Sequence, residues 1–505
     1  MPDRYYLHYL KKSSNAWNSW RERHPDMQPD LSGAVLRRVR LIEANLEDIN
    51  LDGADLSEAN LSGANLKGAR LAGANLSSAN LSGADLSGAD LSRAHLYYAN
   101  FSEANLSQAN LQRANLNEAK LNGANLEQAD LSSAKLNGAK LSETNLSKAK
   151  LAFVDLGGAI LRNIDLGEIR LTGINLKAAN LSSVRVRSVS LRGADLRGVS
   201  FMRMDLNGAD LSGADLSLAD LRETSLMQAD LSGTILKNAL LNDVFFNEAN
   251  LRGADLSGAK INRVDFSGAE LIDADLSNAN LHETRFTQAK LNHANLRDAY
   301  LSRVYFDGAN LSRVNLSSTN LEEIVFDGVS LKGANLSSAN LRNASLSNAI
   351  LKGASLYAAD LTGANLTYVD LRGADLRIAN LRSANLHRAE LSGANLRGKI
   401  LSGINLSEAN LSNADLSKAD LVEADLAGAD LYMANLSGTN LSRANLSNAD
   451  LRGADLNRAH LHGAILDSAN MNGAVLNGTY AVEPENETAA TSIVSSAVSF
   501  SGSTV

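Results

Sequence analysis

The sequence predicts an all-β solenoid, a parallel β-helix in which the chain turns a corner once every five residues. Two observations predict it. Ninety consecutive pentapeptides run from Leu31 to Leu476 without an insertion or a deletion, and eighty of their central residues are Leu. Ala usually lies two residues before each centre and Asp or Asn one residue before it, as in Ala54-Asp55-Leu56. A long internal repeat of fixed period is the signature of a solenoid.

A period of five is incompatible with a straight strand and with an α-helix. In a strand, Leu56 and Leu61 would point to opposite faces. In a helix, successive Leu side chains would step by about 140° and leave no apolar stripe. Both apolar positions face inward only if the chain bends after each unit. The Asn, Asp, Ser and Gly residues at the other positions tolerate such bends.

The spacing of bulky residues predicts four pentapeptides, and therefore four faces, in each coil. Five central phenylalanines recur every twenty residues: Phe246, Phe266, Phe286, Phe306 and Phe326. We expect them to be a core ladder, because stacked equivalent positions need matched volumes. At an inter-strand spacing of ~4.8 Å, about 22 coils would make a rod roughly 108 Å long.

The run of A(D/N)Lxx units resembles the pentapeptide-repeat family, and the resemblance covers residues 31–480. It implies a right-handed, quadrilateral β-helix with the central Leu and the Ala before it pointing inward. It implies little about activity. Some members resemble proteins that bind and protect bacterial type II topoisomerases, and the resemblance therefore adds a gyrase-binding DNA mimic to the hypotheses.

Two short segments flank the repeat. Residues 1–30 hold both tryptophans, Trp17 and Trp20. We expect a short helical cap that begins after Ser13 or Ser14 and covers the open edge of the first coil; a partner-binding arm is the alternative. Residues 481–505 are rich in Ser and Thr, which predicts a disordered tail, with a cover for the last coil as the alternative.

Composition argues against several kinds of site and segment. The chain has no Cys, so disulfides, thiolate metal sites and Cys nucleophiles are excluded. No apolar stretch predicts a signal peptide or a membrane span, so a cytoplasmic location is expected. His460 and His462 lie on one side of a strand but lack further ligands for a metal. We expect no catalytic residues, no metal and no cofactor.

The charge argues against DNA mimicry. Residues 31–480 carry a formal net charge of −6, whereas duplex DNA of that length would carry on the order of 60 negative charges. Four aspartates in the acidic stretch 401–480 are expected to ring one coil: Asp415, Asp420, Asp425 and Asp430. They stand where Asn is equally common, which favours a role in turns over contact with a partner.

Residues 160–205 are rich in arginine. Arg170 and Arg185 replace the usual Asp or Asn, and Arg187 lies beside them. The stretch is either a solvated face or a docking band for an acidic partner or nucleic acid. Tyr300 and Tyr305 are further candidate contact points, because exposed aromatic residues are common at the centres of interfaces.

Lys399 is the clear violation of the inward pattern. An unpaired ammonium group in the core would cost several kcal/mol. We expect the corner to distort so that Lys399 leaves the core and Ile400 partly takes its place. Alternatively, the side chain extends outward between the turns.

Together these features predict a non-catalytic rigid rod that acts as a scaffold or interaction surface for an unidentified protein partner, without direct nucleic-acid binding. A gyrase-binding DNA mimic is the alternative. Homodimerisation stays open: the resemblance implies contacts through C-terminal coils, but a polar tail follows them here.

Overall fold

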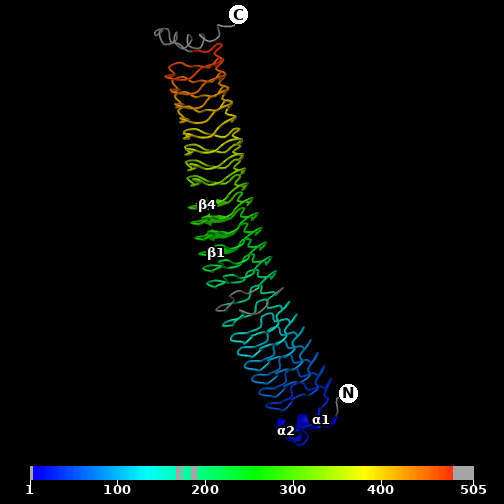
Figure 1. The fold of residues 1–505 in the computed structure, drawn as a ribbon. Helices are drawn as coiled ribbons and strands as arrows, with labels where there is room; N and C mark the ends of the chain where they lie inside the picture. The colour runs from blue at the N-terminus through cyan, green and yellow to red at the C-terminus, as the bar shows by residue number, and fades with distance from the viewer. Residues whose placement is uncertain (1–3, 167–170, 172–173, 182–183, 185–189, 481–505) are drawn as a thin grey trace. The chain divides into compact units, whose positions relative to one another are not determined.

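Parallel β-bridges between residues twenty positions apart dominate the architecture. In the computed structural model, which describes residues 4–166, 171, 174–181, 184 and 190–480, the chain divides into two units, Met1–Lys260 and Ile261–Val505. Within each unit, successive coils lie one above another (Figure 1). The chain is therefore a parallel β-helix, as the repeat predicts.

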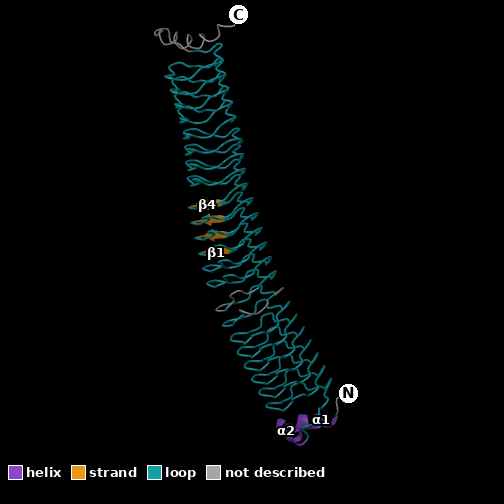
Figure 2. Ribbon diagram, in the orientation of Figure 1, coloured by secondary structure: helices purple, strands orange, loops and turns teal. Residues whose placement is uncertain are grey.

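Few residues belong to longer regular elements. The helices are α1 (Arg4–Lys12) and α2 (Ser14–Arg23), and the strands are β1 (Leu240–Asn242), β2 (Lys260–Asn262), β3 (Asn280–His282) and β4 (Tyr300–Ser302) (Figure 2). β3 and β4 pair in parallel, with Leu281 opposite Leu301. Each strand precedes a corner at which a β-branched residue replaces Ala, and such residues favour extended backbone.

Two backbone hydrogen bonds hold each regular bridge. Asn65, for example, is bridged to Asn45 one coil earlier. The Asn65 N–H donates to the Ala44 carbonyl at 3.0 Å, and the Leu46 N–H donates to the Asn65 carbonyl at 2.6 Å. One coil consequently takes twenty residues, and every inner coil depends on both of its neighbours for its backbone partners.

Most corners are β-turns whose third residue has a positive φ. At one such corner the Ala64 N–H donates to the Leu61 carbonyl at 3.0 Å, and Gly63 has a φ of 65°. Glycine adopts this conformation without steric cost. Glu58 occupies the equivalent position with a φ of 58°, so the stack imposes the same bend on residues with a side chain.

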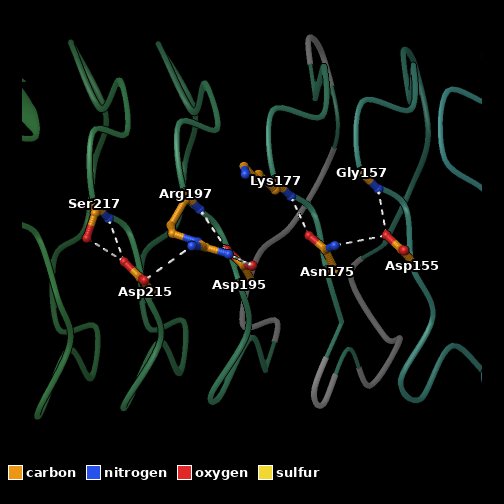
Figure 3. A network of polar contacts seen from close by, with 8 residues as sticks. All are labelled: Asp155, Gly157, Asn175, Lys177, Asp195, Arg197, Asp215 and Ser217. Carbon is orange, nitrogen blue, oxygen red and sulfur yellow. Dashed lines mark hydrogen bonds and ion pairs between the residues drawn. The ribbon is translucent and has the colours of Figure 1, made fainter.

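The Asp or Asn before each centre stabilises the corner that follows. Its side-chain oxygen accepts a hydrogen bond from the N–H two residues later, as Asp155 does from Gly157 at 3.2 Å (Figure 3). This is an Asx-turn. The side chains also connect coils, because Asn175 Nδ2 donates to Asp155 Oδ1 at 2.9 Å.

The core consists of stacked identical side chains. The Phe266 and Phe286 ring centroids lie 5.0 Å apart with nearly parallel planes. The next two pairs, Phe286–Phe306 and Phe306–Phe326, are separated by 5.3 and 5.2 Å. All four rings are buried, and Phe246 is buried within the first unit. Rings stacked at the coil spacing fill the space that Leu fills elsewhere.

Lys399 occupies the inward position, and the expected exchange with Ile400 is wrong. The turn is intact, since the Lys399 N–H donates to the Leu396 carbonyl at 3.1 Å. Ile400 points outward and is 50% exposed. Lys399 Nζ donates to the Ala379 carbonyl of the preceding coil. Burial lowers the pKa of Lys399, against the opposing effect of the Asp375 carboxylate.

The distortion lies in the ladder instead of the corner. In a regular coil the Ile400 N–H would donate to the Ala379 carbonyl. Among the residues that the structure describes, it has no backbone acceptor, and neither the Leu381 N–H nor Asn380 pairs with Ile400. The ammonium group therefore occupies a ladder acceptor, and the backbone pairing between Asn380 and Ile400 is interrupted.

Replacing Lys399 with Ala should raise the free energy of unfolding by about 1–2 kcal/mol, because ladder hydrogen bonds worth roughly 1 kcal/mol each can form again. Urea unfolding measures the change, and slower hydrogen exchange at Leu381 and Ile400 locates it.

The folded-state pKa of Lys399 is lowered from 10.5, so the wild type should regain stability as the pH rises towards 10.5. Lys120→Ala at an exposed site is the control, and an equal response of both variants would contradict the ladder account.

Asp130 provides a pH test of the Asx-turn. Burial raises its pKa, but hydrogen bonds from Ser132, Gln112 and Lys150 outweigh that effect and hold the pKa at about 2. Asp130→Ala should cost about 1 kcal/mol near neutral pH, and Asp130→Asn, which keeps the acceptor, should cost less. Because the folded-state pKa is lowered from 3.8, the difference between wild type and Asp130→Ala should be complete above pH 4 and vanish as the pH falls through about 2. Unfolding curves that keep their separation at pH 2 would refute this.

Candidate interaction surfaces

Helix α2 covers one side of the first coil. Its N-cap Ser13 accepts a hydrogen bond from the Ala16 N–H at 3.1 Å. Trp17 and Trp20 are buried on the inner face of the helix, with ring centroids 5.2 Å apart. The helix therefore begins at the expected serines, and its tryptophans cover apolar core that the first coil would otherwise expose.

Polar side chains of the same helix pair the backbone edge of this coil. Trp17 Nε1 donates to the Asn45 carbonyl at 2.7 Å, and Asn18 Oδ1 accepts from the Asn45 N–H at 2.7 Å. Arg21 Nη2 donates to the Glu47 carbonyl at 2.9 Å. These side chains replace the coil that would precede the first one. Sequence reasoning missed Asn18 and Arg21, because no repeat pattern extends into the helix.

The neighbouring side of the first coil is left open. Among the described residues, the N–H and C=O groups of Val35 and Arg40 and the C=O groups of Arg37 and Ile42 have no hydrogen-bond partner. We call these groups the open edge. A groove of about 810 Å³ runs beside them, lined also by Lys11 at the end of α1.

The groove along the open edge is strongly basic. Its lining contains no acidic residue and five basic ones: Lys11, Lys12, Arg37, Arg38 and Arg40. Glu58 lies outside the lining and pairs with two of these arginines. Hydrogen bonds from Arg38, the larger effect, and from Arg37 lower the pKa of Glu58 to about 2. Within the part of the chain that the structure describes, no ion pair involves Lys11, Lys12 or Arg40.

A second groove, of about 710 Å³, lies at the corner after β4. Tyr300, Tyr305 and Val325 line it, and each is about half exposed. Its lining includes three carboxylates, those of Asp307, Glu322 and Glu323, and a single basic residue, Arg303, which pairs with Glu283 at 2.9 Å. This groove combines aromatic surface with a negative rim, the reverse of the charge at the open edge.

The four aspartates of the acidic stretch do not form one face. Each accepts a hydrogen bond from the N–H two residues later, at 2.9–3.3 Å. They bridge to four different partners twenty residues on, so they lie in four separate ladders: Asp415, Asp420, Asp425 and Asp430. Their carboxylates hold turns on successive sides of one coil.

The arginine-rich band, residues 160–205, lies partly outside the described residues. Arg170, Arg185 and Arg187 lie outside the described residues. Towards its C-terminal side, Arg197 pairs with Asp195 at 2.6 Å and Arg203 pairs with Glu223 at 2.8 Å. At these two positions the positive charge is balanced by a neighbouring carboxylate.

The described residues contain no group of three or more His, Cys, Asp or Glu side chains that could hold a metal ion. His460 stacks on Tyr480, with ring centroids 4.8 Å apart. Within the described part of the chain, neither α1 nor α2 has the length and apolarity that crossing a bilayer requires.

Two substitutions at Trp17 distinguish the packing of its side chain on the first coil from its hydrogen bond to the backbone of that coil. Trp17→Ala should lower the free energy of unfolding by roughly 3–5 kcal/mol, since it leaves a cavity over the first coil. Trp17→Phe keeps most of the packing and should cost about 1 kcal/mol for the lost bond to Asn45. Thermal unfolding with hydrogen exchange at residues 31–50 measures both. A Trp17→Phe variant with wild-type stability and unchanged exchange at residues 31–50 would argue against an edge-pairing role for Trp17.

Two family descriptions match the sequence. "Pentapeptide repeats (8 copies)" matches overlapping segments that together cover residues 28–198, 339–398 and 404–479. "Pentapeptide repeat region" matches segments that cover residues 199–356. No curated protein sequence matches the chain.

Several solved structures of pentapeptide repeat proteins are similar to this chain. HetL, a pentapeptide repeat protein involved in heterocyst differentiation regulation in the cyanobacterium Nostoc sp. strain PCC 7120, is 32% identical; the match covers 44% of this chain and 89% of HetL, with a TM-score of 0.19. A pentapeptide repeat protein of the Arabidopsis thaliana thylakoid lumen is 25% identical over 26% of this chain and 72% of its own, with a TM-score of 0.10.

Full-length QnrB1, a plasmid-mediated fluoroquinolone resistance protein, is 18% identical over 49% of this chain and 91% of its own, with a TM-score of 0.14. The family matches cover most of the chain, and the similarity to HetL extends over nearly all of HetL. The chain belongs to the pentapeptide repeat family.

Proposed function

We propose that this protein is a non-catalytic rod that binds a protein partner and holds it in a fixed position. In this proposal residues 31–480 form a quadrilateral β-helix of about 22 coils, with four pentapeptides in each coil, and the family implies that it is right-handed. Residues 1–30 act as its cap. The protein acts in the cytoplasm, and its partner is a protein and not a nucleic acid.

The groove after β4 is the observation that carries this proposal. Most corners of the described coils expose Ser, Gly or charged residues, whereas this groove exposes Tyr300, Tyr305 and Val325 together. Tyrosine is enriched at the energetic centres of protein interfaces, because it contributes a large contact area at a low cost in conformational entropy. The Tyr300 and Tyr305 N–H groups are paired to the preceding coil, at 2.9 Å to the Ala279 and Thr284 carbonyls. This pairing holds the two tyrosines in place before binding, which reduces the entropy lost on association.

A gyrase-binding DNA mimic is the second candidate. QnrB1, a fluoroquinolone resistance protein, motivates it, although identity at that level speaks only for a common fold. The net charge of −6 over residues 31–480 and the dispersal of the four aspartates around one coil both weigh against it. Homodimerisation is compatible with either function.

Two measurements test the proposal. Purified protein at micromolar concentration should leave the supercoiling activity of bacterial gyrase unchanged; inhibition would favour the mimic. Crosslinking and affinity capture from the native host should recover a partner, and Tyr305→Ala should reduce its retention at least tenfold. Tyr97→Ala, at an exposed tyrosine far along the sequence, is the matched control. Equal retention by both variants would remove the groove after β4 from the proposed function.

A further inference from the structure

We propose that the open edge of the first coil binds an acidic peptide segment, which pairs with the edge through its backbone and bends with the corner between Val35 and Arg40. This second binding site rests on the proposed function only in so far as both assign protein binding to the rod. It uses other residues, in the other unit, and is tested separately.

Within the described part of the first coil, the backbone of the open edge presents unpaired donors and acceptors on both sides of one corner. The paired part of the same coil shows how they are used: the Asn50 N–H donates to the Pro29 carbonyl at 3.2 Å, and the Leu31 N–H donates to the Asn50 carbonyl at 2.8 Å. At Val35 and Arg40 the equivalent donor and acceptor both lack partners among the described residues. An unpaired edge of this kind takes a peptide by backbone pairing. Because the turn from Leu36 to Val39 separates Val35 from Arg40, the bound segment follows the same bend.

The sequence of the first coil departs from the repeat at the open edge. Val35 and Arg40 stand where Asp or Asn is usual, and their counterparts one coil later are Asp55 and Asn60. Asp55 Oδ1 accepts from the Ser57 N–H at 3.1 Å and stabilises its corner. Val35 and Arg40 cannot make such a bond. At the open edge, one apolar and one cationic side chain therefore stand in place of two Asx-turns. The fold alone does not require this replacement.

Charge determines the chemistry of the segment that fits. Lys11 and Lys12 line the groove on the helical side and Arg40 on the coil side. The net charge of this lining favours carboxylates in the bound segment, and charge complementarity also accelerates association. Val35, which is 67% exposed, and the partly exposed Ile42 provide apolar surface between the cations. The matching segment alternates acidic and aliphatic residues.

The edge favours a peptide over a phosphate backbone. Four carbonyl groups of the open edge need hydrogen-bond donors, namely those of Val35, Arg37, Arg40 and Ile42. Phosphate oxygens only accept hydrogen bonds and cannot pair with carbonyls, whereas peptide N–H groups can. The groove lining also lacks aromatic side chains on which nucleic-acid bases could stack.

The binding test uses a fluorescein-labelled peptide, Glu-Asp-Val-Glu-Leu-Glu-Asp, and fluorescence polarisation with the full-length protein. We expect a dissociation constant on the order of 10 μM that weakens with added salt. A Lys-for-acid version of the peptide should not bind. A version with N-methylated backbone amides, which keeps the charge but removes the donors, should bind at least tenfold more weakly.

Charge-reversal variants locate the site. Arg40→Glu and Lys12→Glu should each weaken binding about tenfold. Lys120→Glu is the matched control, because Lys120 lies in the same ladder position as Arg40 but has its N–H paired to the Ala99 carbonyl at 2.9 Å. It should bind the peptide as the wild type does.

A proline pair tests the edge itself. Val35→Pro removes an N–H that has no partner, and proline is tolerated at such edge positions, so the melting temperature should be retained while peptide binding is lost. Asp55→Pro removes a paired N–H, which donates to the Ala34 carbonyl at 2.9 Å, and should lower the melting temperature.

Several results would overturn the inference: absence of peptide binding, equal binding by Arg40→Glu and Lys120→Glu, or insensitivity to N-methylation. Tighter binding of a twelve-nucleotide oligothymidylate than of the peptide would identify a phosphate-binding surface instead. If Arg40→Glu loses the peptide but retains the partner captured through the groove after β4, the two sites are independent. If neither Arg40→Glu nor Tyr305→Ala reduces the retention of a captured partner, that partner binds at neither the open edge nor the groove after β4, and the proposed function must be revised.

Discussion

The backbone ladder between coils is the constraint on which the rest of this structure depends. A residue such as Asn65 uses its N–H towards one neighbouring coil and its carbonyl towards the same neighbour, and the next coil repeats the pattern. Corners, stacked core residues and Asx-turns all keep this register of twenty. An inner coil is therefore satisfied by the coils on both sides. A coil at the end of a stack requires partners from outside the repeat, and α2 supplies them for only part of the first coil.

The regular part of the fold follows from the sequence because each pentapeptide repeats the same local solution. The period of five requires a bend, the residues before the centres provide the Asx oxygens, and the phenylalanines at intervals of twenty residues indicate the coil length. Trp17 and Trp20 are large apolar residues directly before the first coil, and the structure places both in α2 with their side chains buried. These inferences needed only local sequence and the elementary geometry of turns.

What could not be predicted lies where two segments without a common pattern meet. Asn18 and Arg21 pair an edge that the sequence does not mark, since their partners are backbone groups about 26 residues away. Lys399 was recognised as a violation, but its bond to the Ala379 carbonyl depends on which acceptor lies nearest in three dimensions. The open edge was missed because Val35 and Arg40 are unremarkable individually. They become informative only once the structure shows that α2 leaves them unpaired.

The ladder break at Lys399 also affects how the second unit opens. In a linear stack, each coil is stabilised mainly through its nearest neighbours, so cooperativity passes from coil to coil only as strongly as the weakest interface allows. The interface between the coils of Asn380 and Ile400 lacks backbone bonds that other interfaces have. Native-state fluctuations should therefore separate the unit there into two cooperative segments of unequal stability. Among the described residues, the interface between the coils of Tyr305 and Val325 lacks its bridge as well, so the lysine among buried alanines would set one of the boundaries between foldons within this unit.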